Sequence, residues 1–453
     1  VLAQGNTTIF CDSAFVNMLT NSARAFGHVR ILDQVDPIDI ESDYLEYDGN
    51  RRIAKLRKNV VMKDDSVTLY TDNLDYDRTA QVGNYFNGGR LVDESNELTS
   101  DFGYYYTQTK TAEFFQGVDM VNPDFKLKTD TLYYNTNTSL ARTKGYTQGI
   151  TSDSDTLNTD NGLIYNRQKL YAEIYEGNIT NTDVYIEADT IIADDGIQTY
   201  RASQNIIMTS KPDSLTIYGN HGTYRKRIKE AIVFDQAYLK KMLEGDSLFI
   251  SADTLYSNQF NPENKYLTAY HDVKMFKSNM QGLADSVSYN FADSTIFMYK
   301  DPVIWAENSQ LSADSINIEV RANKIDKMNL KQNSFVIQQD SANNFNQVRG
   351  KDMQVFFNEG FISKTDVNGN GESIYYIREA TGAMSMNKMK CSNMALYFNR
   401  NTVTEIRTYQ EVDGQVMPQF EIAPIDKQLR GFVWRNDVRP TLRQVARHLR
   451  WDR

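Results

Sequence analysis

Apolar and polar residues alternate along most of the chain with a period of two, and Asn, Asp, Gly and Pro interrupt the alternation. Residues 248–276 show the pattern once. An alternating run around Ile250 is followed by a turn at 252–254, by a polar loop at 258–265, and by a second run from Leu267 to Met275. This periodicity with turn residues between the runs predicts strands, not helices. We therefore expect an all-β fold.

The same unit recurs about every 30 residues, which indicates an internal repeat. Each unit has an Asp or Asn at the position of Asp253 and usually an aromatic residue four places later. The equivalent Asp or Asn residues are Asp12, Asp43, Asp72, Asp101, Asp130, Asn161, Asp189, Asn220, Asp285, Asp314, Asp352 and Asn393. The aromatic residues include Tyr47, Tyr76, Tyr105, Tyr134, Tyr165, Tyr224, Tyr289, Phe356 and Tyr397. About thirteen units stack in an elongated array, each packing on its neighbours.

The second half of each unit has its own signature. A small residue, an apolar residue, a Gly, Asn or Asp and then a Val or Ile follow one another, as at Ala54, Leu56, Asn59 and Val60. Gly177 and Gly117 stand at the position of Asn59 in other units. Such residues inside a strand predict a bulge or bend with positive φ. A unit of this length has room for up to four strands. The recurrent Asp and Asn residues are interpreted as turn formers that bond their own backbone.

The repeat pattern predicts a continuous array over residues 1–415 and a C-terminal extension over 416–453. From Thr441 to Trp451 the extension has an amphipathic pattern after Pro440, which suits a first helical turn. Leu442, Val445 and Leu449 share one face, and Arg443, Arg447 and Arg450 share the other. We expect a short basic helix that caps the exposed end of the array or docks on a partner or an anionic head group.

Composition narrows the function. The net charge of −10 argues against nucleic acid as a partner, because neutralising phosphates needs a clustered basic face. Cys11 and Cys391 stand near opposite ends of the array, so we expect free thiols. No apolar run approaches the ~20 residues that span a bilayer.

Catalytic chemistry is not indicated. The Asp residues recur in every unit, so none of them is distinguished as an acid or base. The four His residues are scattered, and none has a second His or Cys at ligand spacing. Residues 366–371 match the start of a calcium loop, but Ile377 stands where a Glu is required, which favours a hairpin turn. We expect a protein that is not an enzyme and that has no cofactor and no metal.

A long apolar surface remains. Residues from the second half of many units are expected to point inward in one register. They are Leu56, Val60, Met62, Phe114, Val118, Met120, Ile174, Ile179, Ile206, Met208, Val273, Met275, Val303 and Trp305. A filled core and a groove for acyl chains both fit this set, because Met adapts to loose packing and to variable ligands alike.

The repeated strings SADTLYS, KTDTLYYN and LADSVSYN resemble the OstA-like repeats of the lipopolysaccharide-transport periplasmic bridge family. The ending, Gly431 to Arg435 followed by Arg439 and Pro440, is similar to that of the long, multi-repeat OstA-like proteins of the Bacteroidetes type. The resemblance covers nearly the whole chain. It implies an open, V-shaped β-jellyroll whose trough holds acyl chains while the sugar head stays in water.

The resemblance further implies a place in the periplasm of a Gram-negative cell envelope and a part in outer-membrane biogenesis. Its expected partners are the lipid A acyl chains of lipopolysaccharide, an inner-membrane adaptor and an outer-membrane assembly protein, the two proteins being joined by edge-strand pairing. Head-to-tail self-association follows the same logic. Two alternatives stay open: a parallel β-helix enzyme acting on polysaccharide, and a structural or adhesive β-repeat surface protein.

Overall fold

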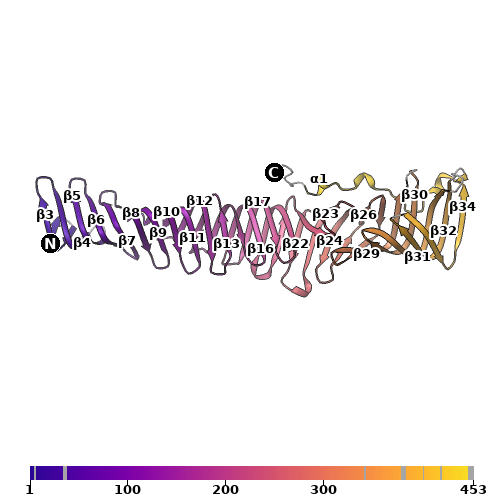
Figure 1. Ribbon diagram of the computed structural model, residues 1–453, viewed down its shortest axis with the longest axis horizontal. Coiled ribbons are helices and arrows are strands. Elements are labelled where there is room, and N and C mark those ends of the chain that lie inside the picture. Colours follow the sequence, from indigo (N-terminus) through magenta and orange to yellow (C-terminus); the bar gives the residue numbers. More distant parts are fainter. Residues whose placement is uncertain are drawn as a thin grey trace. The chain divides into compact units, whose positions relative to one another are not determined.

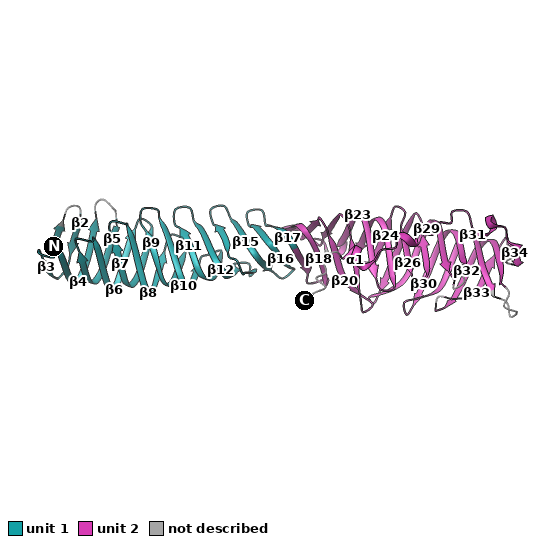
Figure 2. Cartoon of the chain, turned by 90° about the horizontal axis from the view of Figure 1, so that it is seen from above, with its two compact units in different colours: residues 1–205 teal, residues 206–453 magenta. Residues whose placement is uncertain are grey.

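The computed structural model describes the whole chain except residues 5–6, 34–37, 341–342, 379–383, 401, 419–420 and 447–453. Most of the described residues are in β-strands, and neighbouring strands pair antiparallel (Figure 1). The all-β prediction is confirmed. Antiparallel pairing also excludes a parallel β-helix for this part of the chain. The strands form two compact units, Val1–Asn205 and Ile206–Arg453 (Figure 2).

Unit 1 consists of hairpin-connected strands in chain order. They are β1 (Leu2–Gln4), β2 (Thr7–Phe10), β3 (Ser13–Asn17), β4 (Ser22–Asp33), β5 (Ile38–Asp48), β6 (Ile53–Asp64), β7 (Val67–Asp77), β8 (Val82–Val92), β9 (Glu97–Tyr106), β10 (Thr111–Val121), β11 (Phe125–Asn135), β12 (Leu140–Thr151), β13 (Thr156–Thr159), β14 (Leu163–Asn166), β15 (Tyr171–Thr180), β16 (Val184–Asp194) and the first part of β17 (Thr199–Ser210).

The long strands of unit 1 bend in their middle. In β6 the pairing register shifts between Arg57 and Val60, and the two residues between them, Lys58 and Asn59, have φ of 64° and 50°. Gly117 is left-handed as well, with φ of 60°. The predicted bends at Asn59 and Gly117 are confirmed. In β15 the left-handed residue is Glu176, with φ of 45°, and Gly177 follows it.

Each bend divides a strand into two halves that belong to two facing walls. In β6, Ile53–Arg57 lies in the first wall and Val60–Asp64 in the second wall. The turns at the free end of the first wall, which include Arg78 and Lys110, form the first rim. The turns at the free end of the second wall, which begin at residues such as Asp64, form the second rim. One repeat is therefore two bent strands, or four half-strands.

The recurrent Asp residues lie at the bends and do not form turns of their own. Asp43 and Asp72 are in the middle of β5 and β7, on either side of the bend of β6. The Asn59 backbone N–H donates to Asp72 Oδ1 at 3.1 Å, and Asn59 Nδ2 donates to Asp43 Oδ2 at 2.9 Å. The interpretation that they bond their own backbone is wrong here, because the bulge of the neighbouring strand presents unpaired polar groups that the carboxylates accept.

Unit 2 continues the same plan with some longer strands. It contains the rest of β17, β18 (Leu215–Arg225), β19 (Glu230–Phe234), β20 (Tyr238–Leu243), β21 (Asp246–Ser251), β22 (Thr254–Asn258), β23 (Tyr266–Lys277), β24 (Met280–Asn290), β25 (Thr295–Tyr299), β26 (Val303–Ala306), β27 (Ser309–Ser312), β28 (Ser315–Arg321), β29 (Lys324–Gln339), β30 (Phe345–Asn358), β31 (Phe361–Arg378), β32 (Met384–Asn399), β33 (Thr402–Tyr409), β34 (Asp413–Pro418) and the helix α1 (Leu442–Val445).

The segment with the partial calcium-loop pattern is a bend inside β31. The register shifts between Asn368 and Gly371, and Gly369 and Asn370 are both left-handed. The expected hairpin turn is therefore wrong. An Asn and Gly pair serves a two-residue bulge as well as a turn, because both structures need positive φ.

Residues 421–446, which we call the C-terminal strap, leave the sheet after β34 and run back along unit 2 (Figure 1). Their helix α1 packs against β21 and β23, not against the last strands of the array. Leu442 and Val445 are on this helix, and Val445 is buried. Arg447, Leu449 and Arg450 of the predicted helix lie outside the described residues. The strap thus covers a wall of unit 2 and does not cap the end.

Candidate functional site

The two walls of each unit enclose a continuous apolar interior. In unit 1, Leu56 pairs with Leu45 and Leu74 on the first wall, while Met62 pairs with Ile40 and Leu69 on the second. All fourteen expected interior residues are at most 3% exposed, and twelve of them lie outside β26. These twelve are Leu56, Val60, Met62, Phe114, Val118, Met120, Ile174 and Ile179 in unit 1, and Ile206, Met208, Val273 and Met275 in unit 2.

Val303 and Trp305 do not share this register. The row through Met275 continues across the sheet to Gly282 and Ile304, so that Ile304 is the inward residue of β26. Trp305 instead pairs with Gln281 and Gln310, whose side chains contact the C-terminal strap. The expectation that Val303 and Trp305 face the interior is wrong. Both are buried, and the strap runs along the same side of the wall, where it contacts Gln281 and Gln310.

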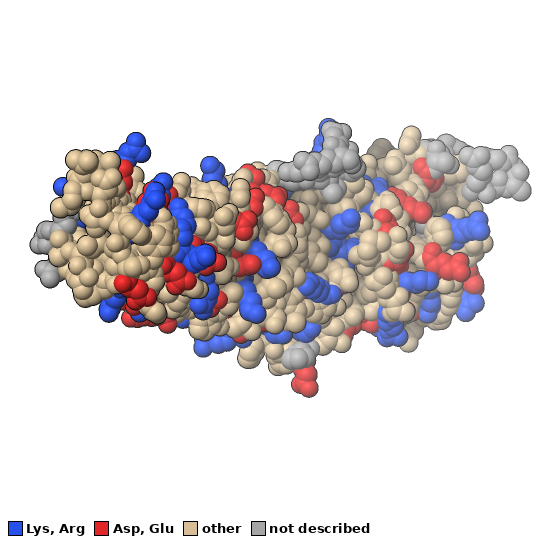
Figure 3. Space-filling model, turned by 60° about the vertical axis from the view of Figure 1, so that its left-hand side comes forward, with Lys and Arg blue, Asp and Glu red and all other residues tan. Residues whose placement is uncertain are grey.

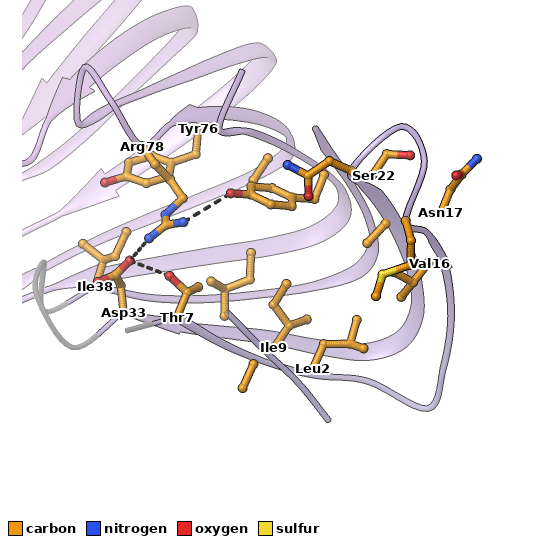
Figure 4. A pocket seen from close by; sticks show the side chains of 17 residues that line it. Leu2, Thr7, Ile9, Val16, Asn17, Ser22, Asp33, Ile38, Tyr76 and Arg78 are labelled. Atoms are coloured by element: carbon orange, nitrogen blue, oxygen red, sulfur yellow. Dashed lines mark hydrogen bonds and ion pairs between the residues drawn. The ribbon is translucent and has the colours of Figure 1, made fainter. Parts of the chain in front are cut away.

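The interior is packed along most of its length. In unit 2 an apolar cavity of about 50 Å³ lies among residues such as Leu239, Ile250 and Leu267. A larger cavity of about 330 Å³ opens at the start of unit 1. Its wall is formed by Leu2, Ile9, Ile38 and their neighbours (Figure 4). Elsewhere in each unit the buried interior side chains fill the space as a core does.

A charged cluster stands at the edge of the larger cavity. Arg78 Nη2 lies 2.6 Å from Asp33 Oδ2, and the same oxygen accepts a hydrogen bond of 3.0 Å from Thr7 Oγ1 (Figure 4). Arg78 Nη1 donates to the hydroxyl of Tyr47 at 3.2 Å. Burial acts to lower the pKa of Arg78, but the hydrogen bonds with Tyr47 and Asp33 outweigh it and raise that pKa. Arg78 therefore stays charged beside an apolar space.

The same kind of contact recurs farther along unit 1, where it closes the gap between the two rims, which we call the mouth. The Tyr105 hydroxyl donates to Asp64 Oδ2 at 2.8 Å, and Lys110 Nζ lies 2.6 Å from Asp64 Oδ1 and 3.0 Å from an Asp65 oxygen. Tyr105 and Lys110 belong to the first rim, whereas Asp64 belongs to the second. These contacts therefore join the free ends of the two walls.

Equivalent contacts, which we call mouth bridges, recur from repeat to repeat. The Tyr134 hydroxyl donates to Asp93, Arg167 Nε donates to Asp124 at 2.8 Å, and the Tyr200 hydroxyl donates to Asp155 at 2.7 Å. The five bridging carboxylates are Asp33, Asp64, Asp93, Asp124 and Asp155. Each contacts a side chain about one and a half repeats later.

Burial is the main reason that the pKa values of Tyr105 and Tyr134 are raised, and the neighbouring Asp64 and Asp93 raise them further. Both phenols are thus neutral hydrogen-bond donors near neutral pH. The sequence pattern identifies these tyrosines only as the recurrent aromatic residue of each unit. The missed signal was the second series of Asp residues, which repeats about every 30 positions at the second rim.

In unit 2 the rims meet through different groups. The Glu244 backbone N–H donates to Asn323 O at 2.9 Å, and Glu244 Oε1 accepts from the Ile325 N–H at 2.9 Å. Lys241 Nζ lies 5.9 Å from the ring centroid of Tyr289, and burial lowers its pKa. Lys277 pairs with Glu244 at 3.0 Å, with both side chains largely buried.

The described surface carries charges of both signs. Figure 3 shows acidic and basic side chains interspersed over one face. Within the described residues no group of three or more His, Cys, Asp or Glu side chains is placed to hold a metal ion. Cys11 and Cys391 are both free thiols. None of the described helices is long and apolar enough to cross a membrane.

The first strands expose apolar side chains. Phe15 and Val16 of β3 are 73% and 50% exposed, and Met18 and Leu19 in the turn that follows are 88% and 98% exposed. Val16 and Met18 also line the larger cavity. This part of unit 1 therefore presents both an apolar surface and the way into the apolar interior.

Comparison with known proteins agrees with the repeat pattern. No curated protein matches the chain. Among solved structures, the periplasmic lipopolysaccharide-transport component LptH of Pseudomonas aeruginosa, described as homologous to LptA, matches with 14% identity and a TM-score of 0.23, over 25% of this chain and 85% of LptH. The family model for OstA-like protein matches residues 1–130, which is the part of unit 1 that contains the first mouth bridges. Residues 1–130 are therefore similar to the OstA-like protein family.

Proposed function

We propose that this chain is a non-enzymatic conduit of lipopolysaccharide transport in the periplasm. Acyl chains of lipopolysaccharide bind between the two walls, and the array bridges an inner-membrane adaptor and an outer-membrane assembly protein through its edge strands. The observation that supports this proposal is the buried apolar row, which runs from Leu56 to Met120 within the residues similar to OstA-like protein and recurs at Met275 in unit 2. The function needs no catalytic residue.

Binding requires the walls to separate, because the interior side chains are packed against one another. Each methylene of an acyl chain that enters an apolar interior contributes about 0.8 kcal/mol. The lost wall-to-wall contacts oppose this gain by a comparable amount per area. Since neighbouring repeats have nearly the same inner residues, neither term changes much along the array. Lipid can then move from repeat to repeat without entering a deep free-energy minimum.

Site-specific photo-crosslinking in cells tests the proposal. A photoreactive residue at Phe114 or Met275, which face the interior, is expected to form lipopolysaccharide adducts. The matched control is Phe115, the next residue of β10, which stacks on Phe102 on the outer face with ring centroids 5.1 Å apart. Equal labelling at Phe114 and Phe115, or labelling at neither position, would contradict the proposal.

A second candidate is a structural β-repeat protein, which the packed interior favours. Its core would stay closed, and inward photoreactive residues would label only the chain itself. The same crosslinking series separates the two candidates, because a structural protein yields no lipid adduct at any inward position.

A further inference from the structure

We propose that the mouth of unit 1 is a latch that an anionic lipid opens by exchange: its phosphate takes over Arg78, Lys110 and Arg167 from the carboxylates of the opposite rim. This inference rests on the proposed function. It adds the class of ligand, a lipid with phosphate beside its acyl chains, and the residues that select it.

The bridges are polar contacts between the two rims that a ligand must break to enter from the side at these positions. Lys110 belongs to a turn of the first rim and Asp64 ends the second wall, and their side chains meet at 2.6 Å. Arg78 and Asp33 have the same relation at 2.6 Å, and Arg167 reaches Asp124 at 2.8 Å. Behind each bridge lie the buried inner residues of the two walls.

The cations, not the carboxylates, are accessible from outside in two of the three bridges. The side chain of Lys110 is 20% exposed and that of Asp64 only 2%, while Arg78 is 26% exposed and Asp33 is 7%. An incoming phosphate therefore meets a partly exposed positive charge first. Arg binds phosphate with two parallel hydrogen bonds, and Lys binds it as a point charge.

The carboxylates that lose their cations in the exchange need a new partner. A buried carboxylate without its cation costs free energy. Asp33 and Asp64 therefore oppose any opening that separates them from their cations without exposing them to water. When the walls part, water reaches them and removes that penalty. A neutral lipid provides no new partner for Lys110 or Arg78, whereas an anionic lipid does. The latch thus favours ligands whose phosphate and acyl chains enter together.

The tyrosine bridges carry no positive charge: Tyr105 shares Asp64 with Lys110, Tyr134 lies between two ionic bridges, and Tyr200 follows the last of them. Tyr105, Tyr134 and Tyr200 are hydroxyl donors to Asp64, Asp93 and Asp155. A freed hydroxyl bonds to water or to a ligand oxygen as a neutral donor, so it attracts an anionic ligand far less than a freed cation does. The tyrosine bridges contribute to the stability of the closed mouth, and the cations determine which ligands open it.

Binding by the purified full chain tests the exchange, measured by displacement of a fluorescent fatty acid. The probes are lipid A with two phosphates, the same lipid A with both phosphates removed, and phosphatidylglycerol. One variant, Asp33→Asn with Asp64→Asn and Asp124→Asn, keeps the cations and weakens the latch. The other, Arg78→Gln with Lys110→Gln and Arg167→Gln, weakens the same bridges but removes the cations.

We expect the Asn variant to bind phosphorylated lipid A at least tenfold more tightly than the wild type, and the Gln variant to lose the preference for phosphorylated over dephosphorylated lipid A. Equal preference in both variants would overturn the exchange while leaving lipid binding intact. Displacement by none of the probes in the wild type would overturn the proposed function and the latch with it. The relative affinities of the wild type for lipid A and phosphatidylglycerol identify which anionic lipid it prefers. Whichever binds more tightly, the preference between them must vanish in the Gln variant.

Folding of each variant is checked by far-ultraviolet circular dichroism. Tyr105→Phe provides a milder control that keeps every charge. It is expected to strengthen binding of phosphorylated and dephosphorylated lipid A by the same factor. If the triple variants do not fold, Asp64→Asn and Lys110→Gln make the same comparison at one bridge, and an unchanged phosphate preference in Lys110→Gln would overturn the exchange there.

Discussion

Gln310 Oε1 accepts a hydrogen bond of 2.7 Å from the backbone N–H of Arg435, which lies 125 residues later in the chain. The Nε2 of the same side chain donates to Val433 O at 2.7 Å. Gln347 repeats the arrangement, donating to Lys427 O and accepting from the Leu429 N–H, both at 2.8 Å. An amide can do both because it carries a donor and an acceptor. The wall therefore holds the C-terminal strap by its backbone at successive repeats.

Replacing Gln310 with Glu is expected to lower the free energy of unfolding by about 2 to 4 kcal/mol. A carboxylate cannot donate to Val433 O, and it would be charged at a position that is 1% exposed. Urea unfolding followed by circular dichroism measures the loss. The same substitution at Gln415, which is exposed on β34, serves as the control and is expected to change stability by less than about 0.5 kcal/mol.

A chain that ends at Pro418 is expected to expose the strap-covered face of unit 2. Trp305 is then the single tryptophan, and its fluorescence emission should shift to longer wavelength because the strap no longer shields it from water. The control is the full chain with Trp434→Phe and Trp451→Phe, in which Trp305 is again the single tryptophan and stays buried. Identical emission from the two proteins would show that the strap does not shield Trp305.

Alkaline pH is expected to destabilise unit 1 through its buried tyrosines. The folded-state pKa values of Tyr105 and Tyr134 are raised above the value of about 10 in the unfolded chain. A raised folded-state pKa gives stability that is present below pH 10 and is lost as pH rises above it, because only the unfolded chain releases the proton. Absorbance at 295 nm should show these phenols ionising together with unfolding.

Tyr105→Phe makes this pH effect specific. The variant is expected to be about 1 to 2 kcal/mol less stable near neutral pH, since Asp64 loses a hydrogen bond. Its stability should then fall less steeply than that of the wild type above pH 10, because one of the raised phenols is gone. A parallel decline in the two proteins would mean that Tyr105 ionises in the folded state as it does in the unfolded chain.

Gly117 tests the left-handed bends. Its φ is 60°, and no atom lies within 4 Å of the place where a Cβ would stand. Gly117→Val is therefore expected to cost about 1 to 2 kcal/mol from backbone strain alone. Gly117→Asn should cost clearly less, because Asn tolerates positive φ. Thermal unfolding of both variants measures the difference, and equal losses would indicate that strain at the bend is not the cause.

The sequence was sufficient for the class of fold and for most of the interior. Alternation and repeat spacing identify Leu56, Phe114 and Met275 as inward residues, because inner and outer faces differ in polarity there. At Val303 to Trp305 alternation does not identify the inward residue. Three buried residues follow one another where the strap runs along the outer side of the wall, and alternation then carries no information on which face is inner.

The position of the bend identifies the inward residue where alternation does not. Asp272 and Asp301 are the second left-handed residues of their bends, and the inward Met275 and Ile304 each stand three places later. The mouth bridges could not be found in this way. Tyr105 and Asp64 are 41 residues apart, and their contact depends on how two walls close, which local patterns do not encode.

The three glutamines that hold the strap also limit how unit 2 can evolve. Gln281, Gln310 and Gln347 meet Arg439, Arg435 and Leu429 in reverse order, so the repeat spacing of the wall must match the length of the strap. Insertion or loss of one repeat between Gln281 and Gln347 would move the glutamine side chains away from the strap residues that they bind. Among the described residues of unit 1 no glutamine holds a returning segment in this way, so repeats there can be duplicated without disturbing such a match.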